Sequence, residues 1–421
     1  MRIAFVCPPI SGHLNPMTAL ARKVQARNHD VICVSFPDAE RSVRAAGLPF
    51  LPCAERDFPV GSLNAWLVRL SKLQGEEALR ATMLNVARRT ETMLNSLPAI
   101  LTHAAVDAVI VDTVLFYVEL APMSLGIPYA HVANALHKDY TGSTPMCFYD
   151  WPHETTPAAV ARNREGVRIF REKLEPTTSV AKVYAERSGL EVDWDNPSAT
   201  ISKLAWISQT PKAFDFDGSW PAQFYHTGPF HDGLGRAPVE FPWDKLTGEP
   251  LIYASMGTMM NGIGDVYRII AAAAAKQKGF QLVLSIGERI RKEEIGPLPN
   301  NSIVVRHAPQ LELLKHTAVC VTHAGLNTVL ESLAKGVPQV AIPMNVDQPG
   351  VAARIADKRT GLFVPFKDLT ESRLTLLLGE VLGDSTYRDN ARRYQKIIAE
   401  TDGLSRAASL LENALQNAQL S

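Results

Sequence analysis

The sequence predicts an α/β protein made of two doubly wound halves, each an open and mostly parallel sheet with helices on both faces. Three observations support this prediction. Short apolar runs alternate with helical patterns along most of the chain. The alternation stops around residues 231–249, where glycine and proline accumulate and apolar residues are few, and it then starts again. The length of 421 residues is sufficient for two domains.

The first half contains four apolar runs with the length and composition of buried strands. They cover residues 3–7, 30–35, 108–112 and 128–133. Helical patterns separate and follow these runs, at residues 14–27, 66–101, 116–125 and 157–188. The two longest helical regions are expected either to line a substrate cleft or to act only as covering helices.

The second half repeats the same alternation. Strands are expected at residues 250–254, 281–285, 302–306, 318–321 and 340–343. Helices are expected at residues 266–278, 311–315, 327–335, 371–382, 388–399 and 406–416. The predicted organisation is an N-terminal domain at 1–235, a linker at 236–249, a second domain at 250–400, and a C-terminal helix at 401–421 that could pack back toward the first domain. Ligands of such sheets bind at the carboxyl ends of the strands, so the two halves predict a cleft between them.

Composition excludes several classes of protein. Lys+Arg and Asp+Glu both total 43, and the resulting net charge of zero argues against nucleic acid as a partner. No apolar run reaches the roughly 18 residues of a transmembrane segment, and the first strand begins directly after Met1-Arg2 with no leader peptide. The five cysteines lack metal-binding spacing and are expected to be reduced core residues. A cytoplasmic location is expected, with loose membrane association left open.

Residues 318–348 carry the strongest local pattern. A buried strand is followed by a glycine turn at residues 323–325, and Asn327 then starts a helix. Free backbone amides and the helix dipole bind anions at such a start, and His323 adds a side-chain donor. Glu331 lies one helical turn further on, where its carboxylate could accept from the hydroxyls of a ribose. The alternative is an ordinary turn whose glycine serves only chain geometry.

The loop after the first strand lacks the glycine pattern of a dinucleotide-binding site. Residues 8–13 contain only one glycine, Gly12, and the GxGxxG pattern of dinucleotide-binding folds is missing. The sequence therefore disfavours an NAD- or FAD-dependent oxidoreductase.

Two sets of residues together resemble the family 1 glycosyltransferases, the UDP-glycosyltransferase family. Residues 307–310 through 347–348 are similar to the nucleotide-sugar signature of that family, and residues 12–16 match the loop that carries its catalytic histidine. The resemblance spans essentially the whole chain. Within the family, similarity to the bacterial carotenoid (zeaxanthin-type) glucosyltransferases rests on residues 214–216, Thr258 and 347–354.

The resemblance implies the GT-B fold, in which two Rossmann-like domains face a central cleft. It also implies an inverting transfer of a sugar, expected to be glucose, from a UDP-sugar to a hydroxyl group. Such a transfer needs a base facing the acceptor hydroxyl, and an imidazole is suited to that task. We expect His13 to be the base and Asp112, at a strand end of the same half, to orient it. The alternatives are a helix-entry histidine and a carboxylate that caps or borders the core.

Departure of UDP builds negative charge on its β-phosphate, and donors held in place for that charge lower the barrier. The residues expected around the donor nucleotide are Ser255, Gly257, Thr258, His307, Ala308, Gln310, His323, Gly325, Leu326, Asn327, Thr328 and Glu331. The residues expected around the donor sugar are Asn134, Asp347 and Gln348. His307 replaces a tryptophan of many relatives, which leaves donor affinity and base preference open. No acidic pair stands where a metal-bridged diphosphate would need one, so we expect no metal and no cofactor, with the UDP-sugar as co-substrate.

Aromatic and apolar residues of the first half suit a hydrophobic alcohol or phenol as acceptor. The candidates are Phe58, Trp66, Phe116, Leu136 and Phe148, although aromatic residues are usually buried in the core. A monomer or weak dimer is expected. The alternative functions are a UDP-sugar epimerase, which would not need His13, and a non-catalytic nucleotide-sugar-binding protein, which would need no base.

Overall fold

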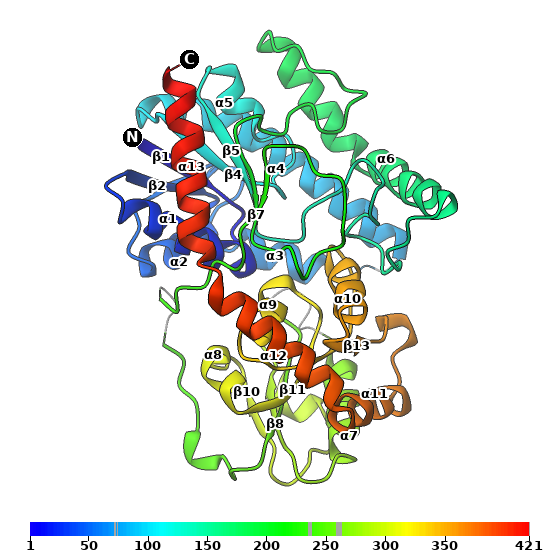
Figure 1. Cartoon of the computed structure of the whole chain (residues 1–421). Coiled ribbons are helices and arrows are strands. Elements are labelled where there is room, and N and C mark those ends of the chain that lie inside the picture. Colours follow the sequence, from blue (N-terminus) through cyan, green and yellow to red (C-terminus); the bar gives the residue numbers. More distant parts are fainter. Residues whose placement is uncertain (71–72, 74, 235–237, 258–262, 421) are drawn as a thin grey trace.

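The computed structural model describes residues 1–70, 73, 75–234, 238–257 and 263–420. The chain forms two halves, one above the other in Figure 1, and each half contains one parallel sheet. These two sheets confirm the predicted fold class.

The sheet of the first half has seven strands in the order β3-β2-β1-β4-β5-β6-β7, and all of its strand pairs are parallel. The strands are β1 (Arg2–Val6), β2 (Asp30–Ser35), β3 (Phe50–Pro52), β4 (Ala108–Asp112), β5 (Tyr129–Ala133), β6 (Trp206–Ser208) and β7 (Phe224–His226). The helices are α1 (Ser11–Gln25), α2 (Glu40–Ala45), α3 (Ser62–Leu70), α4 (Gly75–His103), α5 (Leu120–Ser124) and α6 (Pro157–Arg187). Strand β4 is buried along its whole length. Burial on both faces explains why such strands are continuous apolar runs in the sequence.

The sheet of the second half has six parallel strands in the order β10-β9-β8-β11-β12-β13. The strands are β8 (Leu251–Ser255), β9 (Gln281–Ser285), β10 (Ile303–Val305), β11 (Thr317–Thr322), β12 (Gln339–Ala341) and β13 (Gly361–Phe363). The helices are α7 (Gly264–Ala275), α8 (Gln310–Leu313), α9 (Leu326–Ala334), α10 (Gln348–Asp357), α11 (Glu371–Gly383), α12 (Ser385–Glu400) and α13 (Gly403–Leu420). Short 3₁₀ helices lie at Pro37–Ala39, Trp243–Lys245, Lys292–Glu294, Leu314–His316 and Phe366–Asp368.

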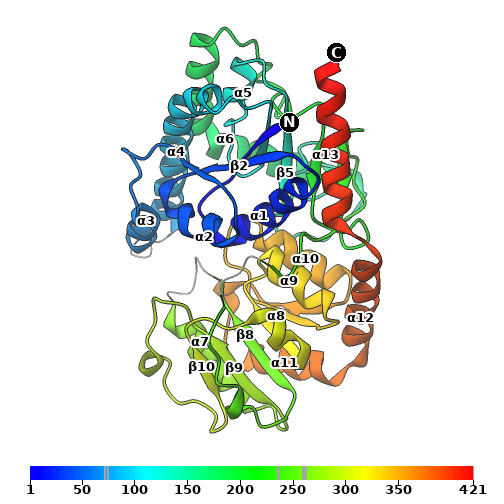
Figure 2. The ribbon, with the colours of Figure 1, turned by 90° about the vertical axis from the view of Figure 1, so that its left-hand side faces the viewer.

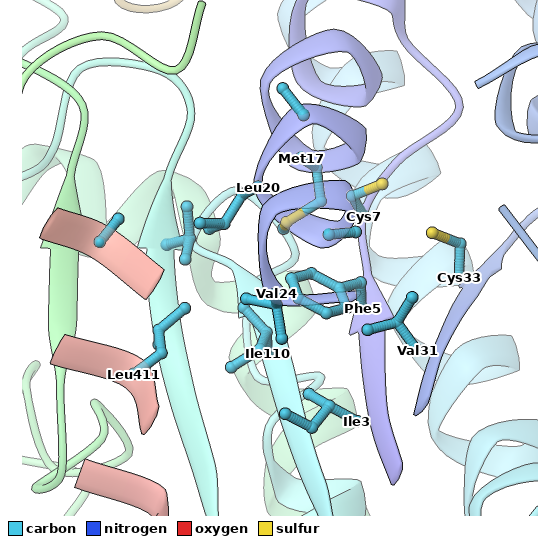
Figure 3. Packing of buried hydrophobic residues seen from close by; sticks show 14 of the residues in the cluster. Ile3, Phe5, Cys7, Met17, Leu20, Val24, Val31, Cys33, Ile110 and Leu411 are labelled. Atoms are coloured by element: carbon cyan, nitrogen blue, oxygen red, sulfur yellow. The ribbon is translucent and has the colours of Figure 1, made fainter. Parts of the chain in front are cut away.

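Helix α13 lies on the first half although it ends the chain. In Figures 1 and 2 it leaves the end of α12 and runs along the upper half, where it packs on α1. Leu411 of α13 joins the core that contains Val24 of α1 and Ile110 of β4 (Figure 3). Arg27 Nη1 also lies 2.6 Å from Glu412 Oε2. The core of the first half is therefore closed by residues from both ends of the sequence.

Several elements differ from the sequence predictions. Helix α5 begins at Leu120, four residues later than the predicted 116, because Tyr117 adopts a φ of 63° and the preceding residues form turns. Strands β3, β6 and β7 were not predicted because three residues are too few to show a period. Helix α10 was not predicted either, since Pro349 and Gly350 in its first turn mask the helical pattern.

None of the helices in the described part of the chain is both long and apolar enough to cross a membrane. All five cysteines are buried, and none forms a disulfide.

The pairing of β12 with β13 provides a test of this packing. Gly361 is the register partner of Gln339, and a Cβ atom on Gly361 would lie 1.9 Å from the Gln339 backbone oxygen. We expect Gly361→Ala to lower the free energy of unfolding by about 2 kcal/mol or more, since backbone cannot yield as a side chain does. The matched control is Gly383→Ala, because Gly383 ends α11 with open space around it. It should be neutral or slightly stabilising. Chemical denaturation of both variants measures the difference, and equal stabilities would contradict the packing.

Candidate active site

The loops that carry the predicted site residues follow the central strands of the two sheets. In the first sheet the strand order reverses direction between β1 and β4, and in the second between β8 and β11. Ligands of doubly wound sheets bind at this switch point, outside the carboxyl ends of the strands. The loops after β1 and β4 meet those after β8 and β11 where α1 lies above α9 and α10 (Figure 2).

His13 and Asp112 are in direct contact at the first switch point. Asp112 is the last residue of β4 and its side chain is inaccessible to solvent, whereas His13 lies in the first turn of α1 and its side chain is 15% exposed. The His13 Nδ1 atom is 2.8 Å from Asp112 Oδ2. The same oxygen accepts from Asn134 Nδ2 at 2.8 Å. The other carboxylate oxygen accepts from the Val114 backbone N–H at 3.1 Å.

This arrangement fixes the imidazole of His13. Because a carboxylate only accepts, Nδ1 carries the proton and Nε2 keeps a free lone pair in the neutral ring. Burial alone would lower the pKa of His13, but the charge of Asp112 and its hydrogen bond outweigh burial, and the pKa is raised above 6.5. The structure thus brings the imidazole of His13 and the carboxylate of Asp112 together, and their roles as base and orienting group stay predictions.

Asn134, which was predicted to contact the donor sugar, lies beside His13 and Asp112. Its amide nitrogen is committed to Asp112. Its Oδ1 atom is buried and has no hydrogen-bond partner within the described ranges. The oxygen thus remains available to a ligand.

The second switch point forms the predicted turn at a helix start. Gly325 caps α9, so the backbone N–H groups of Leu326, Asn327 and Thr328 are in its first turn. The ring of His323 fits between two glycines, since a Cβ on Gly257 or on Gly325 would lie 2.5 Å from it.

Burial lowers the pKa of His323 to about 4, so its imidazole is neutral at neutral pH. Ser255, at the end of β8, accepts from the Gly257 backbone N–H at 3.4 Å. Thr258, a further predicted donor-binding residue, lies outside the described residues.

The loops at the two switch points are joined by hydrogen bonds from side-chain amides. Asn327 Nδ2 donates to the backbone oxygen of Gly12. Gln209 Nε2 donates to Asn327 Oδ1 at 2.9 Å and to the Asn134 backbone oxygen at 2.5 Å. The sequence interpretation missed Gln209. It follows directly after β6, and recognition of that strand would have placed it at the carboxyl edge with His13 and Asp112.

Among the residues predicted around the nucleotide, those near Gln310 are joined by hydrogen bonds, whereas the side chain of His307 lies apart from them. Gln310 Nε2 donates to Glu331 Oε2 at 2.6 Å, and Tyr253 donates its hydroxyl to Gln310 Oε1 at 3.1 Å. Thr328 Oγ1 is 3.4 Å from the Gln310 amide. His307 is exposed, and its Nε2 lies 2.9 Å from a carboxylate oxygen of Glu288. Ala308 is half-buried in the same turn.

The predicted sugar-contacting residues start α10. Asp347 Oδ2 accepts from the Leu136 backbone N–H at 2.9 Å, across the boundary between the halves. Burial raises the pKa of Asp347. Gln348 Oε1 accepts from the Met344 backbone N–H at 2.9 Å and so holds the turn. Val346 within that turn has a φ of 55°, a strained conformation for a β-branched residue.

Of the predicted acceptor residues, the structure brings only Phe116 to a large cavity. A cavity of about 470 Å³ is lined by residues of α6 and of the loop that follows β4, including Thr113. Its aromatic lining consists of Phe116, Tyr117, Tyr140, Phe170, Trp194 and Trp206.

The other predicted acceptor residues lie elsewhere. Phe58 is buried in the core, with its ring 5.0 Å from that of Phe36. Leu136 is buried as well. Phe148 stacks on Phe170 at 4.9 Å, and Trp66 is half-buried on α3. Sequence reasoning could not separate lining from core because both use aromatic side chains.

Comparison with known proteins agrees with this geometry. The family model described as UDP-glucoronosyl and UDP-glucosyl transferase matches residues 245–403. A zeaxanthin glucosyltransferase of Pantoea ananas is 26% identical over 99% of this chain and 96% of that protein. One of Pseudescherichia vulneris is 27% identical over 99% of this chain and 98% of its own length. The crystal structure of the glycosyltransferase of kitacinnamycin superposes with a TM-score of 0.76 at 24% identity, covering 98% of both chains.

The fold and the site therefore define a GT-B glycosyltransferase, which transfers a sugar from a nucleotide-sugar donor to a small-molecule acceptor. The family model and the two full-length relatives show that the chain is similar to the UDP-glycosyltransferase family, the resemblance that its motifs predicted.

The contact between His13 and Asp112 predicts a measurable titration. Asp112→Asn removes the negative charge while burial remains, so the pKa of His13 should fall from above 6.5 to below it. An NMR titration of the imidazole resonances measures this change. His323, at the second switch point, is the internal control, because burial sets its low pKa and Asp112 does not. An unchanged His13 titration would show that the two side chains are not paired in solution.

Proposed function

We propose that this protein is an inverting glycosyltransferase that moves glucose from UDP to a hydroxyl group of a hydrophobic small molecule, with His13 as the general base. The observation that carries the proposal is the hydrogen bond of 2.8 Å between His13 and a buried carboxylate, at a switch point that faces the start of α9.

In the proposed reaction the acceptor hydroxyl lies against Nε2 of His13. The imidazole takes its proton, and the acceptor oxygen forms a bond to the anomeric carbon. The bond from that carbon to the diphosphate oxygen breaks on the opposite face, which inverts the configuration and releases UDP. Asp112 holds the ring in the right tautomer and stabilises the imidazolium that forms. The raised pKa of His13 strengthens it as a base.

We assign the stabilisation of the negative charge on the departing diphosphate to the start of α9. Backbone N–H groups at a helix start, together with the helix dipole, bind phosphate oxygens. A neutral His323, held between Gly257 and Gly325, is proposed as an additional donor. The mechanism proposed here includes no metal ion and no cofactor.

The remaining donor contacts follow the family motif. Glu331 and Gln310 are proposed at the ribose and uracil, with His307 and Ala308 beside the base. Asp347 and Gln348 are proposed at the sugar hydroxyls. Glucose as the sugar is supported by relatives whose names specify glucosyltransferases.

The aromatic cavity is proposed as the acceptor chamber. Its lining includes Thr113, the residue that follows Asp112 in the chain, which supports this assignment. Its aromatic lining favours a hydrophobic alcohol or phenol. In this proposal the domain of residues 1–235 binds the acceptor and the domain of 250–400 binds the donor. The five reduced cysteines support a cytoplasmic location.

The proposed base is tested by His13→Ala. Transfer, measured as acceptor-dependent UDP release with the product mass recorded, should fall at least about a hundredfold, because general-base catalysis contributes that much. UDP affinity should stay within about twofold, since the nucleotide contacts lie in the other half. The exposed His103, replaced by alanine, is the control and should retain full activity. Turnover by His13→Ala with a neutral alcohol would exclude the assigned role.

The proposed ribose contact is tested by Glu331→Ala. UDP affinity measured by calorimetry should weaken about tenfold or more, the usual effect of losing a hydrogen bond to a charged group. The nearby Glu312, which is exposed and paired with Lys315, supplies the control Glu312→Ala with unchanged affinity. If both variants bind UDP as the parent protein does, Glu331 makes no contact with the nucleotide.

A further inference from the structure

Two stretches that stood apart in the sequence, 214–216 and 347–354, meet in the structure. Arg354 of α10 donates from Nε to Asp215 Oδ1 at 2.7 Å. Both side chains are almost inaccessible to solvent, with exposed fractions of 2% and 0%. Because α10 belongs to the second half and Asp215 lies between β6 and β7 of the first, this ion pair crosses from one half to the other.

The geometry of the pair is fixed from several sides. Arg354 Nη1 donates to the Gly350 backbone oxygen at 3.0 Å, and its guanidinium lies 4.2 Å from the centre of the Phe216 ring. The second oxygen of Asp215 faces two imidazoles, with His137 Nε2 at 2.9 Å and His226 Nε2 at 3.5 Å. Burial would raise the pKa of Asp215, but His137 and Arg354 lower it well below its usual range, so the group is a carboxylate.

His137 connects this cluster to the reaction centre. It ends a segment of four residues that begins at Asn134, whose amide holds Asp112. In the same segment the Leu136 backbone N–H donates to Asp347 Oδ2 at 2.9 Å. The segment thus contacts the catalytic pair, the proposed sugar-binding turn and the buried ion pair.

The first turn of helix α10 is also in close contact with the first half. The Gly350 backbone N–H donates to the Cys147 backbone oxygen at 3.0 Å, and a Cβ on Gly350 would lie 2.5 Å from that oxygen. The helix therefore contacts the first half at both Gly350 and Arg354. Asp347 and Gln348, which start the same helix, can move only if those contacts break.

We propose that Arg354 and Asp215 are positioning residues, which hold α10 so that Asp347 and Gln348 meet the donor sugar beside His13. This inference rests on the proposed function. A misplacement of about 1 Å at a reacting centre can reduce the rate about a hundredfold, so the distance of the pair from the chemistry does not prevent a large effect.

The experiment compares Arg354→Met with the double variant Arg354→Met/Asp215→Leu. The single variant leaves a buried carboxylate without its guanidinium partner and should lose thermal stability, whereas the double variant removes both charges and should recover it. In both, we expect kcat/KM for UDP-glucose to fall at least about tenfold. Affinity for UDP should stay within about twofold, since the nucleotide contacts lie on other elements. The affinity for UDP-glucose should fall until it approaches the affinity for UDP alone.

The control is Arg27→Met, which breaks the ion pair with Glu412 that ties α13 to α1, away from α10. It should lower thermal stability and leave both kcat and KM unchanged. A double variant that recovers stability together with full kcat/KM would overturn the inference and leave the pair a structural one. If the parent protein itself binds neither UDP nor UDP-glucose, the proposed function fails, and the inference fails with it.

Discussion

A carboxylate buried at the end of β4 constrains the reaction centre. Asp112 has no access to water, and an ionised group in that position must be hydrogen-bonded or it costs several kcal/mol. Three donors from different segments supply these bonds: the His13 ring on α1, the Asn134 amide after β5 and the Val114 backbone N–H. The orientation of the imidazole is therefore a consequence of folding, and the proposed base is in place before a substrate binds.

The two halves depend on each other through a small number of directional contacts. Gln209 and Asn327 connect the loops at the two switch points, Leu136 holds Asp347, and Arg354 pairs with Asp215. None of these contacts lies within one sheet. Because the proposed donor and acceptor sites belong to separate sheets, such cross-connections, rather than either core, set their relative position.

The similarity to a glycosyltransferase family comes from a sequence motif, whereas the proposed acceptor site is a cavity. The turn before α9, which we propose as the diphosphate site, consists of backbone groups and small residues at a helix start, and such a turn has a clear sequence pattern. The cavity beside α6 is lined by both aromatic and charged side chains from loops and a helix of the first half, and these residues follow no regular spacing in the sequence. The enzyme class can thus be predicted from motifs, whereas the cavity proposed for the acceptor is formed only in the folded structure.

The sequence by itself determined the two parallel sheets, the turn before α9, and the pair of His13 and Asp112. The sheets and the turn follow from local patterns, because burial of a parallel strand requires a continuous apolar run and a helix start requires its own residue types. His13 and Asp112 are far apart in the chain, but each lies at or beyond the end of an apolar run, and the carboxyl ends of parallel strands meet at one edge of a sheet. Only the tertiary structure decided that Gln209 joins the site, that Asn134 holds Asp112, that Phe58 and Leu136 are buried, and that Arg354 meets Asp215. Each of those contacts joins segments far apart in the chain. A side chain carries the same residue type whether it lines a cavity or fills a core, and only the packing of distant elements distinguishes the two.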